Sequence, residues 1–159
     1  MYNIGDKIVY SVHGAGTMID IKDIEIFGEE KSYYILQLPI NNIQVSIPVD
    51  EVDDAVIRPV ITKEEGKKVA EILKSDRTEM SPNWGQRYRE NLETIKNGDI
   101  YEIADIVRNL TLLDLTKGLS ASEKKMLSNS KRVLVSELVI IGAMDKEEAS
   151  DIIDDMITL

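Results

Sequence analysis

Over its first sixty residues the chain alternates apolar and polar positions in short runs. These runs are rich in β-branched and aromatic residues, and they cover residues 7–12 (KIVYSV), 14–28 (GAGTMIDIKDIEIFG), 32–39 (SYYILQLP) and 43–48 (IQVSIP). With Phe27-Gly28 and Asn41-Asn42 as hairpin turns, the runs predict an antiparallel sheet. So small a sheet is expected to curl into a barrel. Pro48 and the residues after it predict a short helical turn that leaves this barrel.

From Thr62 onward the apolar positions recur every three or four residues, which predicts helices. Thr62 and Glu65 form a capping box that opens a helix through about Leu73. Further helices are predicted from Ser81-Pro82 to Asn97-Gly98, from Asp99 to Gly118, from Ser120 (with Glu123) to Gly142, and from Asp145 onward. The expected class is α+β, with a β domain at residues 1–60 and a bundle of four or five helices at 61–159.

Composition excludes several classes of site. The chain has 159 residues, no cysteine and one histidine, so disulfides, cysteine-ligated metals and a histidine-rich metal site are all excluded. We therefore expect no cofactor and no metal. No segment is apolar for long enough to span a membrane, and the first residues lack the pattern of a signal peptide. These features predict a cytoplasmic protein without a membrane partner.

The net charge is −10, which argues against general binding to nucleic acid. The charge is unevenly distributed, however: it is −6 over residues 1–62, +2 over residues 63–136 and −6 over residues 137–159. Only the middle segment therefore has the local cation density that contact with DNA phosphates requires.

Two groups of residues resemble a known family. The first is Gly5-Asp6-Lys7-Ile8-Val9-Tyr10 followed by His13-Gly14-Ala15-Gly16. The second is Asn83-Trp84, Arg87-Tyr88, Asn91-Leu92-Glu93, Asn97-Gly98-Asp99 and the run from Gly118 to Leu127 (GLSASEKKML). Both resemble the CarD/CdnL family of bacterial transcription regulators, and the first is also similar to the polymerase-interacting domain of transcription-repair coupling factor. The resemblance covers nearly the whole chain, and helicase motor motifs are absent.

This resemblance implies both a fold and a mechanism. The β domain would be a Tudor-like barrel that docks on the β subunit of RNA polymerase. The helical domain would touch the minor groove of promoter DNA, without base specificity, at the upstream edge of the bubble. A monomer acting in this way tunes the stability of the open complex and is not an enzyme.

Trp84 is the single tryptophan, and the resemblance implies that it acts as a wedge at the junction of duplex and melted DNA. An apolar ring can stabilise a distorted base step while nearby cations hold phosphates. Composition alone favours the alternative of a tryptophan packed in the core. Gly85 and Gln86 stand where family members often carry polar or basic residues, which reduces the cation density beside this ring.

Four cations complete the predicted DNA surface: Arg87, Arg89, Lys124 and Lys125. The two lysines lie in the first turns of a helix, where such charges also commonly form an ordinary solvated face. Arg87 and Arg89 are two residues apart on a helix and cannot point the same way. One of them could instead support Tyr88 or an acidic neighbour.

The predicted polymerase-binding residues are Ile24, Ile26, Phe27, Val45, Ser46 and Ile47. An exposed edge strand in this region could pair with a strand of the partner. Arginines near these segments contact polymerase in some relatives, and the matching positions here are Ile24 and Ser46. The sequence therefore predicts a docking surface that is more apolar, or shifted.

Two other functions compete with DNA binding. In the first, the helical domain is an acidic adaptor that binds another protein and does not touch DNA. In the second, His13 takes part in hydrolysis, which has little support because no serine, cysteine or metal partner accompanies it. The acidic pairs Asp53-Asp54 and Asp154-Asp155 are predicted to be solvated, since adjacent side chains on a helix diverge.

Overall fold

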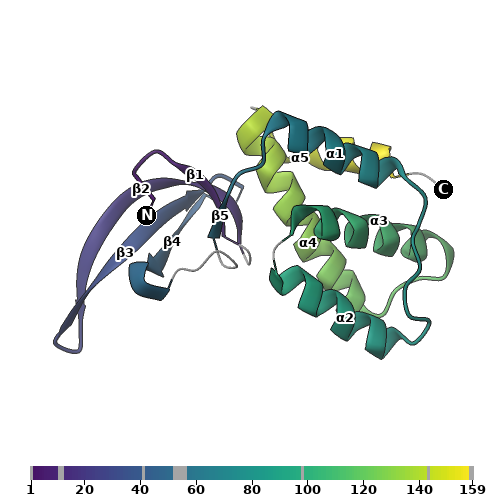
Figure 1. Ribbon diagram of the computed structural model, residues 1–159, viewed down its shortest axis with the longest axis horizontal. Helices are drawn as coiled ribbons and strands as arrows, with labels where there is room; N and C mark the ends of the chain where they lie inside the picture. The colour runs from purple at the N-terminus through teal and green to yellow at the C-terminus, as the bar shows by residue number, and fades with distance from the viewer. Residues whose placement is uncertain are drawn as a thin grey trace.

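A computed structural model describes residues 2–10, 13–40, 42–51, 57–97, 99–142 and 144–157. The strands and the short 3-10 helix are β1 (Lys7–Tyr10), β2 (Gly14–Ile26), β3 (Glu29–Leu38), β4 (Ile43–Pro48), η1 (Val49–Glu51) and β5 (Ile57–Pro59). The helices are α1 (Lys63–Lys74), α2 (Trp84–Asn97), α3 (Ile100–Thr116), α4 (Ala121–Gly142) and α5 (Lys146–Met156). The sheet lies at one end of the molecule and the helices lie at the other (Figure 1).

The strands form one antiparallel sheet in the order β4-β3-β2-β1-β5. In the described part of the chain no ladder joins β4 to β5, so the prediction of a closed barrel is wrong and the sheet is open. The long strands β2 and β3 run past their neighbours as a two-stranded hairpin. Strand β5 was not predicted, and it pairs with β1 through Ile57, Arg58 and Pro59.

The predicted turn at the end of this hairpin is confirmed. Ile26 pairs with Glu29, which leaves Phe27 and Gly28 as a two-residue loop with φ angles of 52° and 80°. Positive φ at both positions is the geometry that matches the twist of the flanking strands. Asn42, with φ of 50°, turns the chain from β3 to β4, whereas its predicted neighbour Asn41 lies outside the described residues.

Helix boundaries follow local capping as predicted in most places. The Thr62 side chain accepts from the Glu65 N–H while the Glu65 carboxylate accepts from the Thr62 N–H, which completes the capping box. Asp99 and Asp145 also cap their helices as predicted. The second helix begins at Trp84, not at Ser81-Pro82, and residues 75–83 form a linker. Its cap is Asn83, whose Oδ1 accepts from the Gln86 N–H at 3.0 Å.

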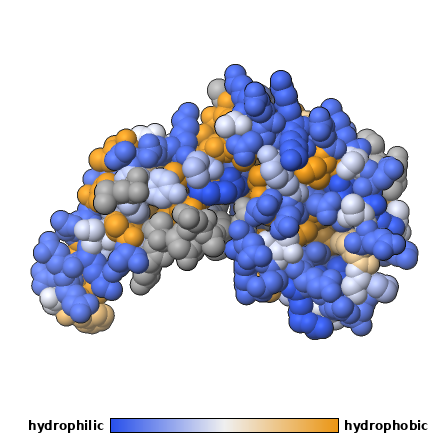
Figure 2. Space-filling model, viewed as in Figure 1, coloured by the Kyte–Doolittle hydropathy of each residue, from blue (hydrophilic) through white to orange (hydrophobic). Residues whose placement is uncertain are grey.

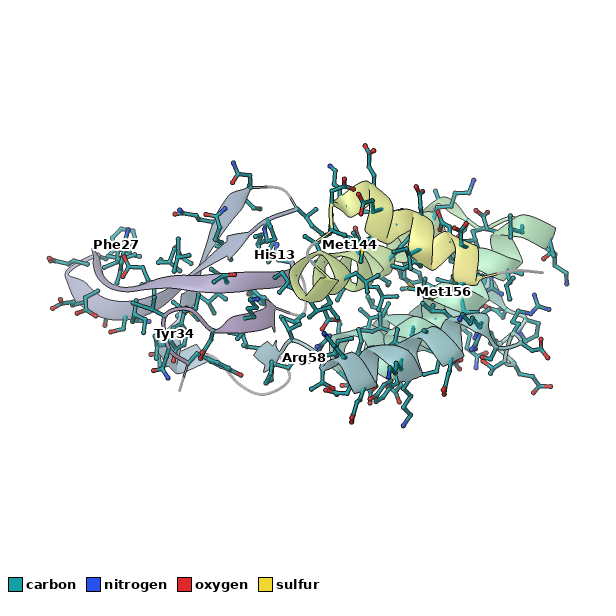
Figure 3. All side chains as sticks on the ribbon, turned by 90° about the horizontal axis from the view of Figure 1, so that it is seen from above. His13, Phe27, Tyr34, Arg58, Met144 and Met156 are labelled. Atoms are coloured by element: carbon teal, nitrogen blue, oxygen red, sulfur yellow. The ribbon has the colours of Figure 1, made fainter. Side chains whose placement is uncertain are left out.

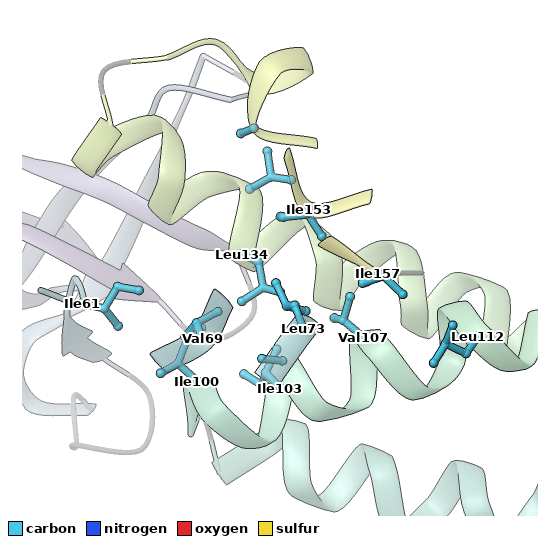
Figure 4. Close-up of a cluster of buried hydrophobic side chains, with 13 residues drawn as sticks. Ile61, Val69, Leu73, Ile100, Ile103, Val107, Leu112, Leu134, Ile153 and Ile157 are labelled. Carbon is cyan, nitrogen blue, oxygen red and sulfur yellow. The ribbon is translucent and has the colours of Figure 1, made fainter. Parts of the chain in front are cut away.

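The helices enclose their own hydrophobic core (Figure 4). Its fully buried members come from four of the helices and include Leu73, Val107, Leu134 and Ile153. Ile61, which follows the last strand directly, is also packed in this core. The described helices include none that is both long enough and apolar enough to cross a lipid bilayer.

A polar joint connects the sheet to α4. The Arg58 guanidinium forms two hydrogen bonds to the buried Glu137 carboxylate, at 2.7 and 2.9 Å. The Ala15 N–H donates to Ser136 Oγ at 2.7 Å. Gly14 has φ of 95°, and a Cβ there would lie 2.7 Å from Ser136 Oγ, so this close approach requires glycine. Figure 3 shows Arg58 where the sheet meets the helices.

Candidate DNA-binding and polymerase-binding surfaces

Trp84 is the first residue of α2, and 58% of its surface is exposed. The alternative of a core tryptophan is therefore wrong. The Asn83 cap fixes the start of the helix, so the indole projects from a defined position at the helix N-terminus. An exposed tryptophan offers a large, flat and partly apolar surface for contact with a partner.

Arg87 is not available to DNA phosphates, which corrects its prediction as a contact. Its side chain is 11% exposed and donates from Nε and Nη2 to the Glu123 carboxylate, at 2.7 and 2.8 Å. Its third donor, Nη1, bonds the Ser81 carbonyl oxygen at 3.1 Å. The prediction failed because Glu123 lies 36 residues away in the sequence, on the first turn of α4.

The two charges of this pair stabilise each other. The hydrogen bond to Glu123 raises the pKa of Arg87 against the opposing effect of burial. The same hydrogen bond from Arg87 lowers the pKa of Glu123, and Ser120 adds to this effect because its Oγ donates to the carboxylate at 3.3 Å. Both groups are therefore charged at neutral pH, and the pair presents no net charge to a ligand.

The Arg87–Glu123 pair has a geometric consequence for the cations around Trp84. It holds the first turn of α2 against the first turn of α4, and Lys124 and Lys125 directly follow Glu123. Both lysines and Arg89 are exposed. A Cβ at Gly85 would lie 3.7 Å from Arg89 Nη1, so the Arg89 guanidinium lies back over the first turn of α2. The structure thus places an exposed indole and exposed cations at the meeting point of two helix N-termini.

The register of the sheet sorts the predicted polymerase-binding residues between its two faces. Ser46 pairs with Ile35, Ile24 pairs with Lys31 and Ile26 pairs with Glu29, which places all three on the face opposite the sheet core. We call this the outer face. Directly paired residues share a face, and alternate residues along a strand do as well.

Val45 and Ile47 lie on the other face of the sheet, so their side chains point away from the outer face. Ile47 is 3% exposed and is a member of the sheet core, against which Val45 packs. Phe27, by contrast, is fully exposed at the tip of the hairpin. Figure 3 shows it at the end of the molecule farthest from the helices, where Figure 2 shows a pale orange patch on a mostly hydrophilic tip.

His13 packs against a neighbouring aromatic ring. It is exposed beside the joint, and its ring meets the Tyr10 ring edge-on with centroids 5.2 Å apart. The described residues contain no group of three or more histidine, cysteine, aspartate or glutamate side chains that could hold a metal ion.

An open sheet joined to a helical bundle, with exposed aromatic residues on both parts, describes a two-part binding protein. Comparison with known families identifies it further. Residues 2–61 match the model described as CarD-like/TRCF RID domain, and residues 68–154 match that of CarD, C-terminal domain. The chain is 38% identical over 148 residues to the Bacillus subtilis (strain 168) protein called "Putative transcription factor YdeB", covering 93% of this chain and 97% of that protein. The chain therefore belongs to the CarD-like family.

Proposed function

We propose that this protein is a transcription regulator that binds the RNA polymerase β subunit with its sheet and promoter DNA with its helical part. It would act as a monomer in the cytoplasm and change the stability of the open complex at the upstream edge of the bubble. This role includes no catalytic step. The match to a domain type shared with transcription-repair coupling factor and the relative's name both support a role in transcription.

Exposure of Trp84 at the start of α2 is the observation on which the DNA contact rests. An apolar side chain inserted at a base step needs a rigid mount and nearby cations to hold the phosphates. The Asn83 cap and the Arg87–Glu123 pair provide the mount. Arg89 and Lys124 provide exposed positive charge.

The outer face and the hairpin tip support the contact with polymerase. Phe27 is bulky and fully exposed, with φ in the left-handed region. Bulky residues adopt this conformation only at a cost of about 1–2 kcal/mol, so its retention favours a binding role. Lys31 pairs with Ile24 across the ladder and so brings a cation to the outer face. Strand β4 is an edge strand that can pair with a strand of the partner.

Open-complex lifetime tests the proposal. Lifetimes are measured on a bacterial promoter with matched RNA polymerase, without the protein, with the wild type and with Trp84→Ala. We expect the wild type to change the lifetime and Trp84→Ala to lose most of that effect while still binding polymerase. If neither protein changes the lifetime although both bind polymerase, the DNA contact must be abandoned.

The main alternative is an adaptor on polymerase that does not touch DNA, which the net charge of −10 favours. Salt dependence distinguishes the two roles, because phosphate contacts make affinity fall as salt rises. Lys124→Ala should flatten that dependence by about one unit of slope if the lysine meets a phosphate. An unchanged slope would support the adaptor.

A further inference from the structure

The linker of residues 75–83, which leads to Trp84, is held at its first half by buried polar side chains. Arg108 is 1% exposed and donates from Nη1 to Ser75 Oγ at 2.7 Å and from Nη2 to Thr78 Oγ1 at 3.3 Å. Asn109 is 2% exposed; its Oδ1 accepts from the Thr78 N–H at 3.1 Å, and its Nδ2 donates to Thr78 Oγ1 at 2.8 Å. Buried groups satisfied in this way fix the path of the backbone.

The second half of the linker is held by the helix that carries Trp84. The Ser81 carbonyl accepts from Arg87 Nη1, and Asn83 caps α2. The linker is thus fixed on both sides of residues 79–80. Arg77 is nevertheless exposed, next to the anchored Thr78.

A groove runs between this linker and the end of α3. Its lining includes Arg77, Met80, Pro82, Leu113, Lys117 and Gly118, and Arg87 also lines it. Arg77 comes from the linker, and Lys117 caps the C-terminal end of α3. Both cations are exposed, and in the described residues neither forms an ion pair or a side-chain hydrogen bond. The lining also includes one acidic residue, Glu79. The charge of Arg87 is already neutralised by its pair with Glu123.

We propose that this groove holds the sugar-phosphate backbone of the DNA strand that continues from the base step at Trp84. Arg77 and Lys117 would bind its phosphates, and the apolar lining would meet a sugar. This inference rests on the proposed function and extends the DNA surface to two residues outside the family resemblance stated above.

Continuity and charge favour a DNA strand as the occupant. Arg87 lines the groove and lies three residues, about 4.5 Å of helix, beyond Trp84. A DNA strand carries a phosphate about every 3.4 Å along the duplex axis, so a strand contacted by the indole has further phosphates within the same region. Two unpaired cations that line one groove from two separate segments match a run of phosphates.

The experiment compares affinity with and without DNA. Labelled full-length protein is titrated with RNA polymerase alone and with polymerase bound to fork-junction promoter DNA, between 50 and 200 mM salt. The variants are Arg77→Gln, Lys117→Gln, their double variant and Trp84→Ala. Lys96→Gln is the matched control, because Lys96 is an exposed lysine in the last turn of α2. Thermal unfolding verifies that each variant folds.

Each groove substitution should reduce by about 0.9 the slope of log affinity for DNA against log salt concentration. Over this fourfold range of salt, the affinity of the variant would then fall about 3.5-fold less than that of the wild type. The double variant should show about twice that reduction, and Lys96→Gln should match the wild type. If Trp84→Ala weakens the DNA-dependent affinity while both groove variants keep the wild-type slope, the groove proposal is overturned and the proposed function stands. Weaker binding to polymerase alone would assign the groove to a protein partner and also overturn it. If DNA adds nothing to wild-type affinity, both proposals fail.

Discussion

Removing Arg87 should destabilise the helical part far more than removing an ordinary surface arginine. In Arg87→Met the Glu123 carboxylate, 1% exposed, loses both charge-assisted hydrogen bonds and keeps only those that the hydroxyl and the backbone N–H of Ser120 donate to it. Breaking a buried pair on one side costs about 3–5 kcal/mol, because the remaining charge is left desolvated. Native domains are stable by only about 5–15 kcal/mol, so a large fraction of stability is at stake.

The assay is urea denaturation followed by circular dichroism, applied to a double-mutant cycle. Arg87→Met and Glu123→Leu should each lower the free energy of unfolding by the amount given above. The double variant should lose less than the sum, because two apolar side chains replace the pair without leaving a buried charge. A cost below about 1 kcal/mol for Arg87→Met, as in exposed ion pairs, would refute the inference that this pair fixes the start of α2.

The same pair predicts a pH dependence with a definite sign. Arg87 lowers the pKa of Glu123 in the folded state, whereas an unfolded glutamate has a pKa of about 4.3. The stabilisation is therefore fully present above pH 4.3 and is lost as the pH falls through the lower, folded pKa. Arg87 stays charged throughout this range. In Glu123→Gln the unfolding free energy should fall less steeply between pH 5 and pH 2 than in the wild type, and parallel curves would contradict this.

Three further predictions concern the sheet and the joint. Phe27→Asn should raise stability by about 1 kcal/mol, because asparagine tolerates positive φ, while weakening affinity for RNA polymerase. Glu137→Ala should lower the free energy of unfolding by about 1.5–3 kcal/mol, since it removes the charge-assisted hydrogen bonds between Arg58 and the buried Glu137 carboxylate. Gly16→Ala should lower it by about 1–3 kcal/mol in a urea titration, because the added Cβ would lie 2.6 Å from the Gln37 carbonyl oxygen.

Each of these has a clear contrary result. Unchanged polymerase affinity in Phe27→Asn would remove the hairpin tip from the interface. For Glu137→Ala the matched control is Asp154→Ala, which breaks the exposed pair with Lys131 and should cost less than about 1 kcal/mol. Equal costs for the two variants would show that burial does not set the strength of the joint. If the urea midpoint of Gly16→Ala equals that of the wild type, strand β3 moves away from the added Cβ at no cost in stability.

The helical part was predictable where its signals are local. The caps at Thr62, Asp99 and Asp145 each act within three residues, so the sequence displays both members of the interaction. The predicted start of the second helix, at Ser81-Pro82, is too early, because proline is common in the first turn of a helix. In the structure Asn83 caps the helix instead, and the preceding residues are held by side chains of α3.

The remaining errors involve partners far apart in the sequence. Strand β5 has three residues and is specified mainly by its pairing with β1, so no alternating pattern announces it. The sequence near Arg87 does not reveal its partner, because Glu123 lies 36 residues away. Arg87 is therefore predicted to be a surface cation. Ile47 and Ser46 were both predicted to contact polymerase, and only the register shows that they lie on opposite faces. For Trp84 the family resemblance implied an exposed position where composition alone favoured the core, and the side chain is exposed.

On the proposed function, the polar joint explains how a protein with a net charge of −10 can use a contact with DNA. Contacts of this kind bind DNA with dissociation constants of only about 10⁻⁴ to 10⁻⁶ M. A short connection to an already bound partner raises the effective concentration to about millimolar, which saturates such a weak contact, provided that the geometry allows both contacts at once. The Arg58–Glu137 pair and the Ala15–Ser136 hydrogen bond hold α4, and through Glu123 the start of α2, at a set position relative to the sheet. Affinity for polymerase would then deliver Trp84 to one place on the promoter, so specificity need not come from the DNA contact itself.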